Sequence, residues 1–316
     1  MGNKKLTILV PLFNEEESLI LLYHRVTKIM ETLLDRYEYE LLLINDGSTD
    51  NSFEVIKDMR EKNSRVSYIN LSRNYGKEIA MMAGLDKATG DAVVILDADL
   101  QDPPELIPEM LMYFEAGYDD VYGKRKSRKG ESWLKRKTSS TFYKVLKKMS
   151  NVPIQEDTGD FRLLSRRAVE ALKRYKECNR YTKGYFSLIG FRKKEILFDR
   201  DTRAAGKTKW NYFKLFELAK NGITSFSTAP LRAIMLLGYS IAIISGVYVV
   251  FIIGKTILFN DHVKGYPSLA CLILFLSAVQ LISIGIIGEY LGRIFYETKN
   301  RPLYFIDEYN GERDNF

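Results

Sequence analysis

The stretch Val94-Ile95-Leu96-Asp97-Ala98-Asp99-Leu100-Gln101-Asp102-Pro103-Pro104 takes an apolar run directly into a cluster of acids. The apolar part predicts a buried strand, with Asp97 and Asp99 at its open end. Side chains two residues apart on an extended segment point the same way, so both carboxylates could face one site. With Gln101 continuing the phase, they suit a hard divalent cation whose other positions water or a substrate phosphate would fill. The alternative is a solvated turn closed by the two prolines, and the rest of the chain decides between them.

Short apolar runs alternate with amphipathic stretches through the first part of the chain. Strands are expected at residues 6–13, 40–45, 66–71, 92–97 and 120–123, and helices at residues 16–34, 51–62, 77–88 and 104–115. This alternation predicts an α/β fold with a mostly parallel sheet that carries helices on both faces. Ligands of such sheets bind at the carboxyl ends of the strands.

Polar residues gather where the expected strands end. Asn14-Glu15 follows the first strand, Asn45-Asp46-Gly47-Ser48-Thr49-Asp50 the second, and residues 97–102 the fourth. We therefore expect three strand ends to converge on one cleft. Asp50 suits the N-cap of the following helix, whereas Asp46, directly before a glycine, has no such local role.

Two later stretches are almost free of charge. Residues 233–258 and 269–287 are each long enough to cross a bilayer, which takes about 20 apolar residues; a buried hairpin in a soluble core is the alternative. Arg232, Arg293 and Lys299 flank the outer ends of the pair, so the positive-inside rule places both ends in the cytoplasm. The apolar run at residues 6–10 is too short for a signal peptide. We expect an integral plasma membrane protein with two spans, both termini in the cytoplasm and a cytoplasmic first region.

The net charge of +7 is concentrated in residues 124–148, where eleven lysines and arginines accompany a single acid, Glu131. A basic block beside membrane spans suits the anionic membrane surface. It carries no recognisable nucleic acid-binding motif, so nucleic acid is not expected as a partner. The chain holds only two cysteines and two histidines, which argues against a disulfide, a cysteine-based metal site and a Ser-His-Asp triad.

Residues 210–226 carry aromatic residues and leucines at helical spacings, with lysines between them. The pattern predicts an interfacial helix lying on the bilayer before the first span, with packing against the globular domain as the alternative. Within the spans, small residues recur four apart at Gly238, Ala242 and Gly246, and again at Gly288 and Gly292. This spacing permits close helix contact within or between subunits, and we expect a homo-oligomer.

Four segments together carry a family resemblance: Val10-Pro11-Leu12-Phe13-Asn14-Glu15-Glu16, residues 45–50, residues 97–104, and Asp157-Thr158-Gly159-Asp160-Phe161-Arg162-Leu163. They resemble the family-two glycosyltransferases of the GT-A fold, and the similarity covers nearly the whole chain. Within that family the chain looks most like the polyprenyl-phosphate glycosyltransferases, which include dolichyl-phosphate mannose synthases and the bacterial GtrB and CsbB proteins. The expected division is a cytosolic GT-A (Rossmann-like) domain at residues 1–210, an interfacial region at 211–230, two transmembrane helices within 231–292 and a cytosolic tail at 293–316.

The resemblance implies a nucleotide-sugar donor, usually linked to UDP. Its uridine would contact Pro11, Asn14, Glu15 and Asp46. The family's metal signature falls on Asp97, Asp99 and Gln101, where Mg²⁺ or Mn²⁺ would bridge to the diphosphate and neutralise charge on the leaving group. A flexible-loop pair that closes over the diphosphate would be Arg203 and Lys207.

The acceptor is expected to be a lipid phosphate, which is already an anion and needs no strong general base. The site must instead position two anions close together and screen their repulsion. Arg125, Arg136 and Ser140 are the expected acceptor-phosphate residues, the last two sharing a helix face by their spacing. Asp157 and Asp160 lie either near the anomeric carbon or on sugar hydroxyls, with a fold-stabilising role open for one of them, and Arg162 would neutralise the pair. Together with Asp99 these two acids are the expected catalytic residues.

The function implied is inverting, metal-dependent transfer of a sugar from a UDP-sugar to a polyprenyl phosphate, with undecaprenyl phosphate expected, at the cytosolic membrane face. A flippase and a downstream glycosyltransferase would use the product for cell-envelope glycans. One alternative is a catalytically silent subunit or scaffold that binds a nucleotide sugar. Another is a polysaccharide synthase, although Gly206-Lys207-Thr208-Lys209-Trp210 stands where those enzymes carry Gln-x-x-Arg-Trp. No motif fixes which sugar is transferred.

Overall fold

A mixed β-sheet dominates the part of the chain that the structure describes. This computed structural model describes residues 4–126, 158–177, 182–199, 228–259 and 265–313. The strands are β1 (Lys4–Leu12), β2 (Tyr37–Asn45), β3 (Val66–Leu71), β4 (Ala92–Ile95), β5 (Asp120–Arg125), β6 (Thr158–Ser165), β7 (Lys193–Phe198), β8 (Ile306–Tyr309) and β9 (Glu312–Arg313). They lie side by side in the order β7-β5-β6-β4-β1-β2-β3-β8-β9.

The centre of the sheet is parallel, as the sequence predicts. Strands β4, β1, β2 and β3 pair in parallel. Strand β6 then enters antiparallel between β4 and β5, and it was not expected from the sequence. Because β6 runs the other way, its amino end lies at the edge where the central strands have their carboxyl ends.

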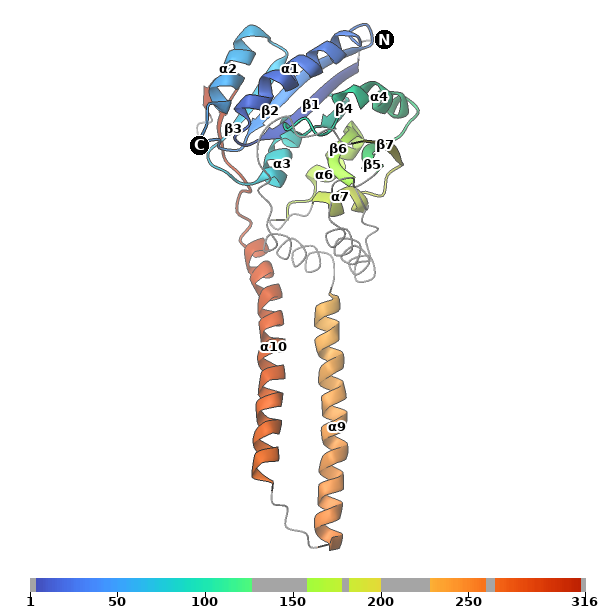
Figure 1. Cartoon of the computed structure of the whole chain (residues 1–316), viewed down its shortest axis with the longest axis vertical. Helices are drawn as coiled ribbons and strands as arrows, with labels where there is room; N and C mark the ends of the chain where they lie inside the picture. The colour runs from blue at the N-terminus through green and yellow to red at the C-terminus, as the bar shows by residue number, and fades with distance from the viewer. Residues whose placement is uncertain (1–3, 127–157, 178–181, 200–227, 260–264, 314–316) are drawn as a thin grey trace.

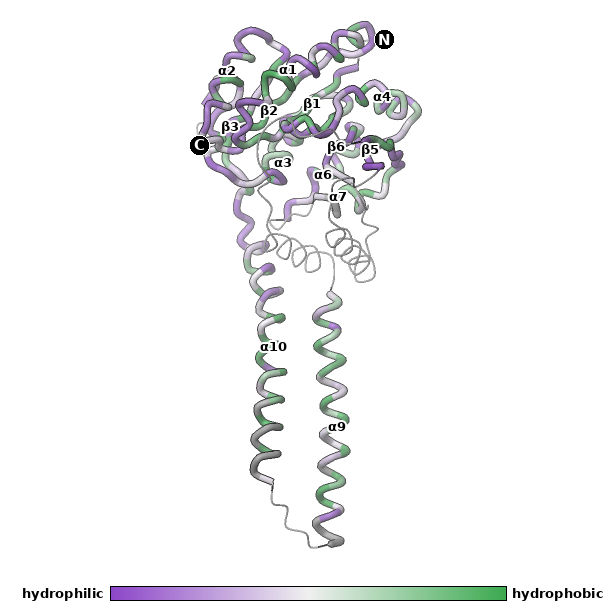
Figure 2. The backbone as a smooth tube through the Cα atoms, in the orientation of Figure 1, coloured by the Kyte–Doolittle hydropathy of each residue, from purple (hydrophilic) through white to green (hydrophobic). Residues whose placement is uncertain are grey.

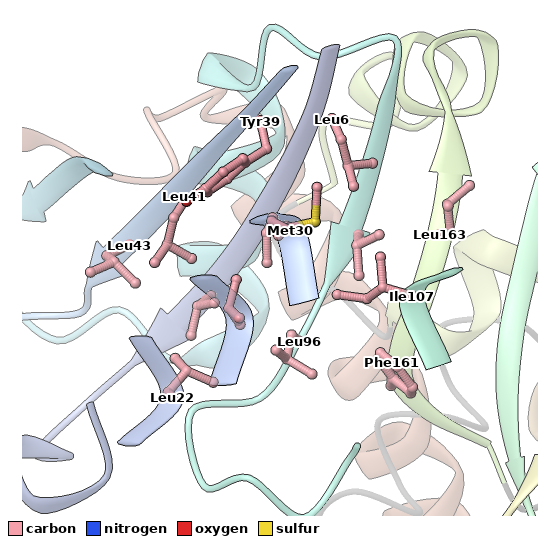
Figure 3. Close-up of a cluster of buried hydrophobic side chains, with 14 of the residues drawn as sticks. Leu6, Leu22, Met30, Tyr39, Leu41, Leu43, Leu96, Ile107, Phe161 and Leu163 are labelled. Carbon is pink, nitrogen blue, oxygen red and sulfur yellow. The ribbon is translucent and has the colours of Figure 1, made fainter. Parts of the chain in front are cut away.

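Helices cover both faces of the sheet. They are α1 (Glu16–Glu31), α2 (Ser52–Lys62), α3 (Lys77–Lys87), the short 3₁₀ helix η1 (Pro104–Leu106), α4 (Ile107–Glu115), α6 (Arg166–Lys173) and α7 (Thr182–Leu188). Alternate residues of β1 point to opposite faces, so Leu6, Ile8 and Val10 pack with α1, α2 and α4, while Leu9 packs with α3, α6 and α7. Figure 3 shows the first of these two apolar layers.

One expected strand is shorter than predicted. The strand expected at residues 92–97 ends at Ile95, and the chain then bends through a turn in which Leu100 has a positive φ of 57°. Asp99 therefore lies in this turn and Asp97 lies just before it, so neither acid belongs to the strand as expected. Just before the turn, the Leu96 N–H still donates to the Leu9 carbonyl at 3.0 Å.

The C-terminal residues, expected as a tail, belong to the sheet. Strand β8 pairs antiparallel with β3, and β9 pairs antiparallel with β8. Two further contacts fix the approach to β8: the Ser72 N–H donates to the Phe305 carbonyl at 3.0 Å, and the Tyr304 hydroxyl donates to Asp86 at 2.8 Å. The polar sequence Ile306-Asp307-Glu308-Tyr309 is too short to be recognised as a strand without its partner.

Two long helices form a hairpin beside the domain (Figure 1). Helices α9 (Ala229–Phe259) and α10 (Tyr266–Thr298) are both long and apolar enough to cross a membrane, and the stretches concerned are 0% buried within the structure. Figure 2 shows the apolar residues along both helices. The absence of burial speaks against the alternative of a soluble-core hairpin. Most of the expected interfacial region lies in residues 200–227, outside the described residues.

Candidate active site

A cavity of about 190 Å³ lies at the carboxyl ends of the central strands. Its walls come from the ends of β1 and β2, from the turn after β4 and from the start of α3. The lining residues are Pro11, Leu12, Phe13, Glu15, Asp46, Lys77, Ala80, Asp97, Ala98 and Asp99. The expected convergence of three strand ends on one cleft is confirmed.

The two signature acids share this cavity but have different surroundings. Asp97 is partly exposed and forms an ion pair, whereas Asp99 is only 6% exposed and its Oδ1 accepts from the Gln101 N–H at 3.2 Å. The Gln101 side chain is not among the lining groups. Within the described ranges, no three His, Cys, Asp or Glu side chains gather into a metal cage. Two carboxylates on one cavity do fit Mg²⁺ or Mn²⁺, because magnesium sites commonly use one or two carboxylates and take the remaining oxygens from substrate phosphates and water.

Lys77 is a site residue that the sequence reasoning missed. Its Nζ lies 2.6 Å from Asp97 Oδ1 and 2.6 Å from Asp160 Oδ2, so one ammonium joins the turn after β4 to the start of β6. Desolvation acts to lower the pKa of Lys77, but the charges of Asp160 and Asp97 outweigh it and raise the pKa above the usual lysine range. The available signal was a lysine directly after Gly76, at the first position of an expected helix.

Asp46 holds the loop that leads to Lys77. Its Oδ1 accepts from the Tyr75 N–H at 2.7 Å and its Oδ2 from the Gly76 N–H at 2.9 Å. Burial raises the pKa of the Asp46 carboxyl, and these two hydrogen bonds lower it only in part. The next residue must be glycine, because Gly47 has a φ of 65° and a Cβ there would lie 2.5 Å from the Arg73 carbonyl carbon. Asp46 thus has a structural role beside the donor contact predicted for it.

Asn14 and Glu15 connect the loops after β1 and β2. The Asn14 Oδ1 accepts from the Thr49 N–H at 2.8 Å, and the Asn14 side chain does not line the cavity. Glu15 does line it, while its N–H donates to Ser52 Oγ at 2.9 Å. The N-cap of α2 is Asn51 and not Asp50, so the capping role expected for Asp50 is wrong. Asp50 Oδ1 still accepts from the Ser52 N–H, at the first residue of α2, at 3.1 Å.

Strand β6 brings Asp160 next to the cavity, where its Oδ2 lies 2.6 Å from Nζ of Lys77, a residue of the lining. Arg162, expected to neutralise Asp157 and Asp160, pairs with Asp120 of β5 at 3.1 Å, and both side chains of this pair are fully buried. Its guanidinium carbon also lies 3.5 Å from the centre of the Phe186 ring. The charge of Asp160 also acts on Arg162, and Asp157 lies outside the described residues. Pairing of β5 with β6 adds Asp120, an acid that the linear sequence places far away.

Arg125 lies close to the start of β6. A Cβ at Gly159 would lie 3.9 Å from Arg125 Nη2 and 3.8 Å from Asp102 Oδ2, so both groups border this glycine. Arg125 therefore borders the amino end of β6, whereas the side chain of Asp160, the next residue, points to the other face of the sheet. Five other expected site residues, Asp157, Arg136, Ser140, Arg203 and Lys207, lie outside the described residues, and their roles stay predictions.

Comparison with known proteins supports the resemblance. Residues 7–173 match Glycosyl transferase family 2. The chain is 45% identical over 302 residues to an Escherichia coli protein named prophage bactoprenol glucosyl transferase homolog, covering 96% of this chain and 98% of that protein. It is 42% identical over 305 residues to the putative glycosyltransferase CsbB of Bacillus subtilis, covering 96% and 92%.

Among solved structures, it is similar to glucosyl-3-phosphoglycerate synthase from Mycobacterium tuberculosis in complex with Mn²⁺, UDP and phosphoglyceric acid. The TM-score is 0.47 at 18% identity, with 70% of this chain and 76% of that chain covered. The family match and the full-length relatives show that this chain belongs to glycosyl transferase family 2 and is a glycosyltransferase.

Proposed function

We propose that the protein transfers a sugar from a UDP-sugar to a polyprenyl phosphate, namely undecaprenyl phosphate, with inversion at the anomeric carbon and with Mg²⁺ or Mn²⁺. The observation that carries the proposal is a cavity that Asp97 and Asp99 share, in a family-two domain that is joined to a hairpin apolar enough to span a membrane. A relative named bactoprenol glucosyl transferase matches over 96% of the chain, which supports a polyprenyl acceptor.

On the donor side, Asp97 and Asp99 would hold the divalent ion, which would neutralise negative charge on the departing diphosphate. Pro11, Glu15 and Asp46 line the same cavity and would border the nucleoside. Asn14 stays a predicted contact, and it would act by holding the wall in place through Thr49. Gln101, Arg203 and Lys207 complete the predicted donor and metal set.

On the acceptor side, the lipid phosphate needs positioning more than activation. Arg125, beside Gly159, would attract the acceptor phosphate to the amino end of β6. Arg136 and Ser140 would complete this phosphate site. Because the phosphate oxygen itself attacks the anomeric carbon, Asp157 and Asp160 would orient the sugar and stabilise positive charge on it.

The surroundings of the site fit a cytoplasmic face. The start of α9 and the end of α10 are the ends of the hairpin that face the domain (Figure 1), which supports a location of the domain and the two termini on one side of the membrane. The positive residues at those ends support a cytoplasmic location for that side. There the product would pass to a flippase and a downstream glycosyltransferase for cell-envelope glycans, and the protein would act as a homo-oligomer.

The test is transfer of labelled sugar from a panel of UDP-sugars to undecaprenyl phosphate by detergent-purified protein. The reactions contain Mg²⁺ or Mn²⁺, with EDTA as the metal-free control. The expected result is a lipid-linked product from one donor, formed only with metal. UDP binding without product from any donor would overturn the proposal and favour a catalytically silent subunit.

A further inference from the structure

The ion pairs of Lys77 place its ammonium beside a carboxylate of the proposed metal site, where a bound metal ion would otherwise supply the positive charge. The Lys77 ammonium lies 2.6 Å from Asp97 Oδ1, on an acid that lines the cavity together with Asp99. The same ammonium lies 2.6 Å from Asp160 Oδ2. It therefore neutralises carboxylates from two segments that would otherwise repel each other across the cavity.

The position of Lys77 on its helix makes this arrangement unusual. Lys77 is the first residue of α3, where the partial positive charge of the helix dipole disfavours a cation. The two acids supply the attraction that holds the ammonium there. Helix stability alone would favour an acid at this position. We therefore attribute the lysine to its role in balancing the negative charges in the cavity.

The base of Lys77 is fixed while its end can move. Asp46 accepts hydrogen bonds from Tyr75 and Gly76, the two residues before Lys77, and so fixes the backbone. The Lys77 side chain itself is 42% exposed, and its four-carbon stem has several rotatable bonds. The ammonium can therefore leave Asp97 without any movement of α3.

A divalent ion and the ammonium compete for Asp97. Magnesium binds a carboxylate oxygen at about 2.0–2.1 Å, which would put it within a few ångströms of an ammonium on the same group. Two cations so close repel each other, and repulsion is strong in a partly buried cavity. A donor diphosphate would add negative charge to the cavity and relieve this repulsion.

We propose that Lys77 is a tethered cation that takes the place of the divalent metal on Asp97 in the donor-free enzyme and yields this carboxylate when metal and donor arrive together. The inference rests on the proposed function, since it concerns the same site. It makes metal and donor binding cooperative: metal alone must displace Lys77, whereas metal with a diphosphate offers the released ammonium a new anionic partner in the same cavity.

The test measures Mn²⁺ binding directly, as loss of the free-ion signal in electron paramagnetic resonance, on the detergent-purified full chain. In the donor-free protein, Lys77→Met should bind Mn²⁺ more tightly than wild type, by about 5–150-fold, the usual range of coupling between two sites. Addition of UDP should strengthen Mn²⁺ binding strongly in wild type and much less in Lys77→Met. Equal or weaker donor-free binding by Lys77→Met would overturn the proposal.

Two controls separate charge in the cavity from other effects. Lys87→Met removes one positive charge from the far end of α3 and should bind Mn²⁺ like wild type. Lys77→Arg keeps a cation and should keep weak donor-free binding; tight binding by this variant would also count against the proposal. Should Lys77→Met fail to fold, Lys77→Gln serves as the neutral variant.

A further variant distinguishes failure of this inference from failure of the proposed function. Asp97→Asn should abolish Mn²⁺ binding in the presence of UDP. If it does not, the metal site itself is wrong, and the proposed metal-dependent transfer fails with it. If Asp97→Asn abolishes binding while Lys77→Met leaves donor-free binding unchanged, only the role given to Lys77 is wrong.

Discussion

Asp99 combines a backbone contact with a place in the cavity wall. Its Oδ1 accepts from the Gln101 N–H, and asparagine at this position keeps an oxygen for that bond while removing the charge. We expect Asp99→Asn to unfold at the wild-type temperature and to lose metal-dependent transfer by more than about 100-fold, since a divalent ion contributes several kcal/mol of charge stabilisation. Transfer within twofold of wild type would contradict the metal assignment.

Arg162 and Asp120 depend on each other because both are fully buried. Removing one partner leaves a buried charge without compensation, which typically costs about 3–5 kcal/mol, whereas replacing both by apolar groups is often neutral. We therefore expect Arg162→Met to lower the unfolding temperature sharply, and Arg162→Met with Asp120→Val to recover most of the loss. A double variant as unstable as the single one would show that the pair matters through more than its charges.

Single residues were predictable where a local pattern carried their chemistry. Asp97 and Asp99 were found because an apolar run ends in acids. Asp46 was found because it precedes a glycine and has no local role such as that of a helix cap. Lys77 and the partner of Arg162 were not, because both depend on contacts across the sheet. A lysine at the start of a helix has no distinguishing sequence pattern. Its partner Asp160 lies 83 positions later in the chain and meets it only in the folded protein.

At the scale of elements, the alternation of strands and helices predicted the parallel centre of the sheet. It did not predict the antiparallel strands on either side of that centre. Strand β6 is recognisable as an apolar run only in part, and its antiparallel insertion is fixed by pairing with β4 and β5. This insertion matters for the site, because it delivers Asp160 to the carboxyl edge from the amino end of a strand. The rule that ligands meet strand carboxyl ends cannot place such a residue.

Strand β8 is held to β3 by Asn310 as well as by the strand ladder. The Tyr68 N–H donates to Asn310 Oδ1 at 2.8 Å, the Asn310 N–H donates to the Tyr68 carbonyl at 3.2 Å, and Asn310 adopts a positive φ of 51°. Asn310→Ala should cost about 1–3 kcal/mol, because it leaves the Tyr68 N–H without its acceptor, and alanine also tolerates this φ poorly.

The measurement is amide hydrogen exchange with mass spectrometry on the full chain. Exchange should quicken in residues 66–72 and 306–310 of Asn310→Ala, and it should stay at the wild-type rate in Glu312→Ala, whose side chain is exposed. Unchanged exchange in β3 would show that the backbone pairing alone secures β8.

At the scale of the molecule, the hairpin is longer than a bilayer requires. Helices α9 and α10 contain 31 and 33 residues, which gives lengths of roughly 46 and 50 Å against a hydrocarbon core of about 30 Å. The end of α10 that faces the domain carries the Glu289–Arg293 ion pair at 3.1 Å. Only residues 299–305 separate α10 from β8. The second span is therefore tied directly to the sheet edge, beside the loop that leads to Lys77.

This connection means that the domain consists of two chain segments on either side of the hairpin. A chain cut after Ala229 loses β8 and β9 and so exposes the edge of β3, and unpaired strand edges promote aggregation. We expect residues 1–229 alone to aggregate or unfold at a lower temperature than the same residues joined by a flexible linker to residues 301–316. Burial of Ile306 alone accounts for about 1.5–3 kcal/mol of that difference.

Size-exclusion chromatography and thermal unfolding would compare the two soluble proteins, with UDP binding as the measure of an intact cavity. A rejoined chain that carries Ile306→Asp is the matched control, because it restores the linker and the backbone but not the buried side chain. It should behave like residues 1–229 alone, since a buried carboxylate without a partner disfavours docking of β8. If residues 1–229 were monomeric and as stable as the rejoined protein, β8 would be an accessory strand and the tie between the second span and the domain would carry no stability.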